Sequence, residues 1–228
     1  MAVNVILNSE YNVYANVFDN NKGRISYPTR NFLYNANSSN LFANCSKLEM
    51  DISQMKGNWN LVTNMTRSFY NCSNITGAPF FPVNISNIVN TYYNCYSLVG
   101  LFPQYVNVNN MYGTFYNCKG LTGNPSSGNN LTDISYCYYN ITSINGIMYL
   151  NYNSTAEVNA TNAFYGRDTN EKLYIYVKPN SKWNNWFYNN CSIYGNSLNW
   201  TLLHNRYYNL NSSTIVKYGD GYGDVYLN

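Results

Sequence analysis

The residues of this chain that could do chemistry are six cysteines, one histidine and ten carboxylates among 228 residues. Cysteine thiolates bind metals or attack electrophiles, histidine transfers protons, and a pair of carboxylates can hydrolyse a glycosidic bond. Four of the cysteines recur at similar intervals: Cys45, Cys72, Cys95 and Cys118. Their spacing has to be explained before any of them is assigned to a site.

The histidine and the carboxylates do not form a catalytic motif. His204 stands in the stretch WTLLHNRYY, without a serine or cysteine nucleophile motif nearby. Glu49 and Asp51 suggest a glycosidase pair, but two acids at i and i+2 are more typical of solvated loop charges. Asp220 and Asp224, in YGDGYGDVY, lack the further ligands of a calcium loop and indicate a tight turn. We expect a non-enzymatic protein with no cofactor and no metal site.

Charge is scarce and neutral polar residues are abundant. Only 10% of the residues are charged, the formal net charge is +3, and no block of lysine or arginine stands out. We therefore expect no nucleic-acid partner and no anionic membrane partner. The first residues, MAVNVILNSEYNVYANVF, lack the basic and apolar regions of an export signal, and no run of about 18 apolar residues follows. The sequence thus predicts a chain that neither spans nor anchors in a membrane.

A repeat of 23 residues organises the middle of the chain. The stretch FYNC at 69–72 returns as YYNC at 92–95, FYNC at 115–118 and YYNI at 138–141. With the first aromatic residue of each stretch as position 0, apolar residues recur at −7, −4, +3 and +6, asparagine or aspartate at −5, and glycine at +8. Looser copies bring the total to about six or seven between residues 37 and 195.

Each copy is expected to fold as one rung, a short helix followed by a very short strand. Asparagine at −5 can cap the helix, and positions −4, 0 and +3 fall on one helix face. Positions +6 to +8 then form an extended segment, in which the glycine permits a backbone conformation closed to other residues. Because one rung cannot bury its apolar face alone, the rungs must stack, about 4.8 Å apart where strands pair.

Two of the copies resemble a known family. The stretches NMYGTFYNCKGLTG and NMTRSFYNCSNITG are similar to the BspA-like, bacterial-surface-protein class of leucine-rich repeats. The stretch KLYIYVKPNSKWNNW resembles the strand and proline-led helix that end such arrays. The resemblance implies a right-handed solenoid used for surface attachment, and it supplies no catalytic residue.

The predicted fold is therefore an α/β repeat solenoid, a leucine-rich-repeat-like right-handed superhelix with rungs of about 23 residues. Residues 37–195 form the solenoid. Residues 1–36 form an N-terminal cap or attachment segment, and residues 196–228 form a C-terminal cap. Both terminal segments are rich in residues that favour strands.

The repeat gives the cysteines a structural interpretation. Cys45, Cys72, Cys95 and Cys118 all occupy position +3, where the next copy has Ile141. A position that isoleucine fills equally well is an apolar packing position, so we expect a ladder of buried thiols. Disulfides between rungs and a zinc site are the weaker alternatives, because parallel side chains give poor disulfide geometry and no C-x-x-C pair is present.

Positions +1 and +2 should face outward or sideways, beside the buried positions 0 and +3. They form a candidate face for a ligand or partner that consists of Tyr70, Asn71, Tyr93, Asn94, Tyr116, Asn117, Tyr139 and Asn140. Such a surface suits carbohydrate, whose apolar ring faces stack on aromatic rings and whose hydroxyls need neutral partners. It suits packing between rungs or subunits equally well.

These observations favour a non-enzymatic phage virion protein, such as a head fibre, tail fibre or decoration protein, that attaches to a host surface or glycan. The expected partners are other virion proteins, further copies of the chain, and a host-surface glycan or protein. A bacterial cell-surface adhesin is the alternative, and a polysaccharide-degrading tail protein is the third hypothesis. The expected location is the virion, or the bacterial surface under the alternative.

Overall fold

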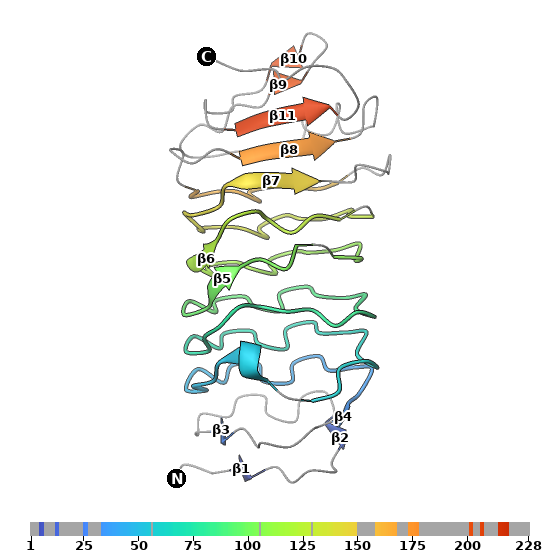
Figure 1. Cartoon of the computed structure of the whole chain (residues 1–228), viewed down its shortest axis with the longest axis vertical. Coiled ribbons are helices and arrows are strands. Elements are labelled where there is room, and N and C mark those ends of the chain that lie inside the picture. Colours follow the sequence, from blue (N-terminus) through green and yellow to red (C-terminus); the bar gives the residue numbers. More distant parts are fainter. Residues whose placement is uncertain are drawn as a thin grey trace.

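The computed structural model describes residues 33–55, 57–104, 106–128, 130–149 and 158–167, and short strands outside these ranges. The described coils of the chain lie one above another in chain order and form a single column (Figure 1). Each coil is one rung, and the repeat of 23 residues corresponds to one full coil.

The regular elements are very short. Twelve are assigned among the described residues: β1 (Val5–Ile6), β2 (Asn12–Val13), β3 (Ile25–Ser26), β4 (Leu33–Tyr34), the 3-10 helix η1 (Ile52–Gln54), β5 (Val99–Leu101), β6 (Gly120–Thr122), β7 (Gly146–Tyr149), β8 (Leu173–Val177), β9 (Thr201–Leu202), β10 (Arg206–Tyr207) and β11 (Thr214–Tyr218). Most of each rung is built from turns and extended backbone between these elements.

The rungs pair with one another in parallel. Strand β5 pairs with β6, β7 pairs with β8, and β8 pairs with β11, all in parallel register. Isolated parallel bridges join equivalent positions −5 of neighbouring rungs, such as Asn64 with Asn87 and Asn110 with Asp133. Among the described pairs only β9 with β10 is antiparallel. Equivalent residues of consecutive rungs are therefore direct neighbours in space.

The prediction of a short helix in each rung is wrong. The described residues contain one helical element, the three-residue η1, so the fold is not an α/β leucine-rich-repeat solenoid. The segments expected to be helical are successions of turns in which N–H groups alternate between two kinds of acceptor. The Tyr70 N–H donates within its rung to the Arg67 carbonyl at 3.1 Å, whereas the Phe69 N–H donates to Thr91 on the next rung at 2.9 Å.

The physical reason is a pair of left-handed residues in every rung. Positions −2 and +2 have φ between 51° and 79° in the six described copies: Asn40 and Asn44, Arg67 and Asn71, Asn90 and Asn94, Gly113 and Asn117, Tyr136 and Asn140, Asn162 and Gly166. An α-helix requires a right-handed conformation at every residue. The two left-handed residues, four positions apart in each rung, instead turn alternate N–H groups toward the next rung. Asparagine and glycine tolerate this conformation best, which explains their recurrence.

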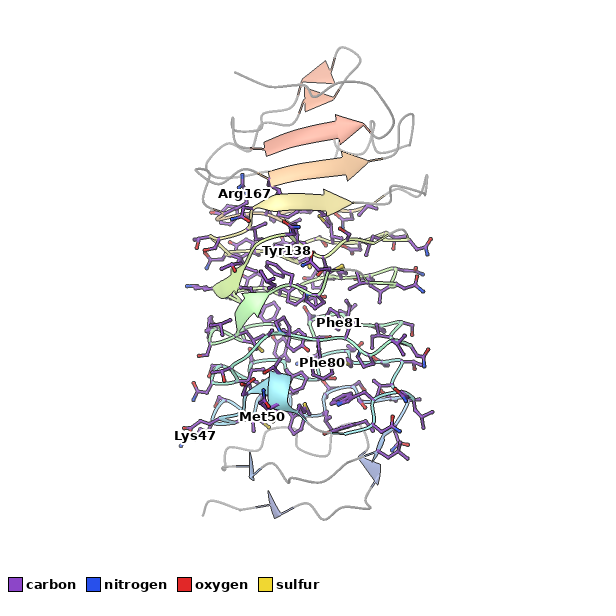
Figure 2. All side chains as sticks on the ribbon, viewed as in Figure 1. Lys47, Met50, Phe80, Phe81, Tyr138 and Arg167 are labelled. Carbon is purple, nitrogen blue, oxygen red and sulfur yellow. The ribbon has the colours of Figure 1, made fainter. Side chains whose placement is uncertain are left out.

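The apolar columns fill the inside of the stack. The residues at position 0 form a continuous column of stacked rings with centroids 5.3 to 5.9 Å apart: Phe42, Phe69, Tyr92, Phe115, Tyr138 and Phe164. Figure 2 shows Tyr138, Phe80 and Phe81 within the column of rungs and Lys47 at its rim. The buried residues form one core cluster from Tyr34 to Leu173.

The polar residues at position −5 and the glycines at position +8 stabilise the turns of each rung. The Asn64 side chain accepts from the Thr66 N–H at 2.9 Å, and other rungs repeat this bond at position −5. It closes a local turn rather than capping a helix. The glycines at +8 have φ of 83°, 100°, 83° and 78°, so the backbone there is the left-handed kind that the sequence predicts: Gly77, Gly100, Gly123 and Gly146.

The terminal segments are described only at a few strands. Within residues 1–36, β1 pairs with β3 and β2 pairs with β4, both in parallel. Within residues 196–228, β11 adds a parallel strand to β8, which lies in the predicted solenoid. Residues 35 and 36 are also described, and β9 pairs with β10 within the C-terminal segment. The other residues of both predicted caps, and the boundary predicted at residue 195, lie outside the described residues.

Candidate functional site

Five half-buried tyrosines form a ladder along one side of the stack. Consecutive rings lie parallel, with centroids 4.9, 4.3, 4.6 and 4.7 Å apart and interplanar angles between 4° and 20°. We call this set, all at position +1, the tyrosine ladder: Tyr70, Tyr93, Tyr116, Tyr139 and Tyr165. Each rung contributes one tyrosine, so the distance between neighbouring rings follows the distance between neighbouring rungs.

Stacking changes what the tyrosine ladder can offer to a ligand. Because each inner ring lies between two others, its faces are covered, and its edge and hydroxyl are what remains for solvent. Burial, together with the neighbouring Tyr116 and Tyr70 rings, raises the pKa of Tyr93 to about 12. Burial, again with tyrosine neighbours, also raises the pKa of Tyr139. The hydroxyls of Tyr93 and Tyr139 are therefore neutral at physiological pH. The hydroxyls of the tyrosine ladder form a row of hydrogen-bonding groups. The expectation that ladder ring faces would stack on sugars does not fit this geometry.

The neighbouring asparagines at position +2 form a second ladder. Each side-chain amide donates through Nδ2 to the Oδ1 of the preceding rung, at distances of 2.8 to 2.9 Å. We call this set the asparagine ladder: Asn44, Asn71, Asn94, Asn117 and Asn140. One amide proton of each donor is used in this way, and the second remains for another acceptor. The ladder thus links rungs and leaves a row of polar groups beside the tyrosines.

An arginine lies against one tyrosine near the start of the tyrosine ladder. The Arg67 guanidinium carbon is 4.3 Å from the centroid of the Tyr70 ring, a cation–π contact. The preceding rung has Ala43 at position +1, so no aromatic ring continues the ladder in that direction. Arg67 therefore covers part of a ring that stacking alone would leave open.

The cysteines at +3 are packing elements of the core. Cys45, Cys72, Cys95 and Cys118 are buried and form no disulfide with one another. Three of these thiols donate to the carbonyl of the position-0 residue on the preceding rung, at 2.9 to 3.0 Å. Burial raises the pKa of Cys72, Cys95 and Cys118 well above the ordinary value, and neighbouring thiols add to the effect at Cys72 and Cys95. Protonated, enclosed thiols of this kind are neither nucleophiles nor metal ligands.

The candidate acids have structural surroundings or lie outside the described residues. The Asp51 side chain caps η1, accepting from the Ser53 N–H at 2.9 Å and from the Ser53 hydroxyl at 2.6 Å. Glu49 is exposed. His204, Asp220 and Asp224 are not among the described residues. In the part of the chain that the structure describes, no three histidine, cysteine or acidic side chains converge as a metal site would require.

The sequence reasoning missed one aromatic group on the same side of the stack. The Tyr136 ring lies 5.9 Å from the Tyr112 ring at 63°, and 5.9 Å from the Tyr139 ring at 39°. Tyr112 is 39% exposed. Neither Tyr112 nor Tyr136 belongs to a repeating aromatic column, so the repeat pattern does not predict that these two rings meet. The available signal was the tyrosine at position −2, where most rungs have asparagine or glycine.

Comparison with known proteins gives no match: no protein-family model, no curated protein and no solved structure is similar to the chain. Within the described ranges, no helix is long and apolar enough to cross a bilayer. The functional argument therefore rests on the geometry of the ladders and of the residues beside them.

Proposed function

We propose that this chain is a non-enzymatic attachment protein whose tyrosine and asparagine ladders bind a neutral surface glycan. The setting that we propose is a phage virion, as a fibre or decoration protein that assembles with other copies and other virion proteins. The observation that carries the proposal is the two ladders running side by side over four consecutive rungs. They form a row of neutral donors and acceptors at the regular spacing of the rungs.

A row of this kind suits a ligand that repeats along its length. A glycan chain presents hydroxyls at regular intervals and carries no charge that the protein would have to match. The rigidity of the face also favours binding, because stacked rings and paired amides are already ordered before the ligand arrives. Few charged residues, 10% of the chain, are consistent with recognition by neutral hydrogen bonds.

The non-enzymatic part of the proposal is supported by the chemistry of the described side chains. Asp51 is committed to the η1 cap, and the cysteine thiols of the core are held protonated by burial. General acid–base or covalent catalysis needs a titratable group in contact with substrate. The half-buried face that we assign to binding presents phenols and amides instead.

The proposal is tested with a variant that removes hydroxyls and keeps the rings. Tyr93→Phe combined with Tyr116→Phe leaves the stacking in place, because phenylalanine stacks with the same geometry. Wild type and variant are run by affinity electrophoresis through gels that contain laminarin, mannan, dextran or galactomannan. We expect wild type to be retarded by at least one polysaccharide. We expect the variant to bind about tenfold more weakly, since each lost hydroxyl bond is worth about 0.5–1.5 kcal/mol.

The melting temperature of the double variant is the control for folding. An unchanged melting temperature with weaker retardation supports the proposed face. A wild-type protein that none of the four gels retards, or a double variant retarded as strongly as wild type, contradicts it.

A further inference from the structure

Tyr136 is an exception to the backbone rule of its own column. Position −2 has a positive φ in every described rung, and most copies meet it with asparagine or glycine: Asn40, Asn90, Gly113 and Asn162. Tyr136 holds the same conformation, with φ of 55°, although it has a bulky side chain. A left-handed backbone is unfavourable for such a residue. The left-handed conformation therefore costs stability at Tyr136, and the turn itself does not require a tyrosine side chain.

The ring of Tyr136 is directed at other tyrosines. It meets Tyr112 edge-on at 63° and Tyr139 at 39°, with centroids 5.9 Å apart in both pairs. We call Tyr112, Tyr136 and Tyr139 the tyrosine cluster. The rings of the tyrosine ladder lie within 20° of parallel and cover each other, but the rings of the cluster are splayed. Tyr116 and Tyr165 stack on the two faces of Tyr139, whereas the splayed rings of Tyr112 and Tyr136 leave part of their faces available for contact with a ligand.

We propose that the tyrosine cluster is a subsite for one sugar ring of a neutral glycan. The apolar face of the sugar would pack on the splayed rings, and its hydroxyls would bond to the phenols. This inference rests on the proposed function and deepens it, because the tyrosine ladder, Tyr139 included, supplies hydroxyls, whereas Tyr112 and Tyr136 supply ring faces. A cation is the other ligand that an aromatic cluster can hold, and the net charge of +3 does not favour it.

The test compares two substitutions at position −2. Tyr136→Asn installs the residue that the column normally has and removes one ring of the cluster. Asn40→Gly is the control on a rung without a ladder tyrosine, where φ is 51° and glycine keeps the same backbone conformation. Both variants are run with the polysaccharide that most retards wild type. We expect Tyr136→Asn to keep or raise the melting temperature and to weaken binding at least tenfold. We expect Asn40→Gly to bind within twofold of wild type.

The outcomes separate this subsite from the proposed function. Wild-type binding that Tyr93→Phe with Tyr116→Phe weakens but Tyr136→Asn leaves intact overturns the subsite alone. A lower melting temperature for Tyr136→Asn also overturns it, because the ring would then be a packing element. Release of the polysaccharide by choline would show a cation subsite and would overturn the assignment to a sugar. A wild-type protein that binds none of the polysaccharides removes the proposed function and the subsite together.

Discussion

Asn94 shows how a single residue type serves backbone and side chain at once. Its φ of 60° is unfavourable for most residues, and asparagine tolerates it. Its amide donates to Asn71 at 2.9 Å and its Oδ1 accepts from Asn117 at 2.8 Å. Glycine would satisfy the backbone and lose both bonds, whereas glutamine would change the reach of the amide. Asparagine at +2 is therefore fixed by two requirements that no other residue meets together.

The buried thiols predict how stability depends on pH. Burial raises the pKa of Cys95 and Cys118 well above the ordinary value of 9.0, so the folded chain holds these protons more tightly than the unfolded chain. The resulting contribution to the free energy of unfolding is fully present below pH 9.0. It is lost as pH rises, because only the unfolded thiols ionise. Urea unfolding at a series of pH values should show a midpoint that falls steadily above about pH 9.

A substituted chain provides the control for that pH dependence. Cys95→Val with Cys118→Val keeps apolar side chains of similar volume in the core and removes two titrating groups. The decline of the midpoint at alkaline pH should be shallower in this variant than in wild type. Equal slopes in the two proteins would show that the thiols do not cause the decline.

The turn segments of the rungs show what could and could not be predicted at the scale of the element. Apolar residues at −4, 0 and +3 fit a helix face, and the structure does bury them, as in Met65, Phe69 and Cys72. The same spacing also fits two successive turns, because both conformations return to one side after three or four residues. The deciding signal was asparagine or glycine at −2 and +2, and Arg67 and Tyr136 obscured it.

The tyrosine and asparagine columns were likewise predictable as ladders, but their contacts were not. Column spacing places Tyr93 beside Tyr116 without specifying that the rings lie parallel within 4°. Ring orientation depends on how closely the rungs approach, and this distance is set by turns that the helical interpretation did not include. Tyr112 and Tyr136 come together only through a backbone conformation that is unusual for tyrosine.

Gly120 tests the close approach of neighbouring rungs in the β5–β6 pair. A Cβ atom added there would overlap the Leu98 carbonyl oxygen and would lie 3.1 Å from the Val99 side chain. Since the backbone oxygen cannot move away freely, Gly120→Ala should lower the free energy of unfolding by about 1–3 kcal/mol. Lys119→Ala, at the adjacent exposed position, should change it by less than about 0.5 kcal/mol. Chemical denaturation of both variants makes the comparison, and equal effects would contradict a close approach at Gly120.

At the scale of the whole molecule, the stack is a one-dimensional array in which each rung contacts its neighbours. Stability in such an array is a sum of terms within rungs and between adjacent rungs. The ring column at position 0, the thiols at +3 and the asparagine ladder all act between rungs. The face that we assign to binding is thus a direct product of the same contacts that hold the chain together.

The central claim is that side-chain ladders between neighbouring rungs hold the array and order its binding face. A double-mutant cycle on Asn94→Gly and Asn117→Gly tests it most directly, because glycine keeps the positive φ of 60° and 61° and removes only the amides. We predict a coupling free energy of about 1 kcal/mol from the bond between these side chains. A cycle on Asn44 and Asn117, which do not bond to each other, should give about zero. Zero coupling between Asn94 and Asn117 would contradict the account.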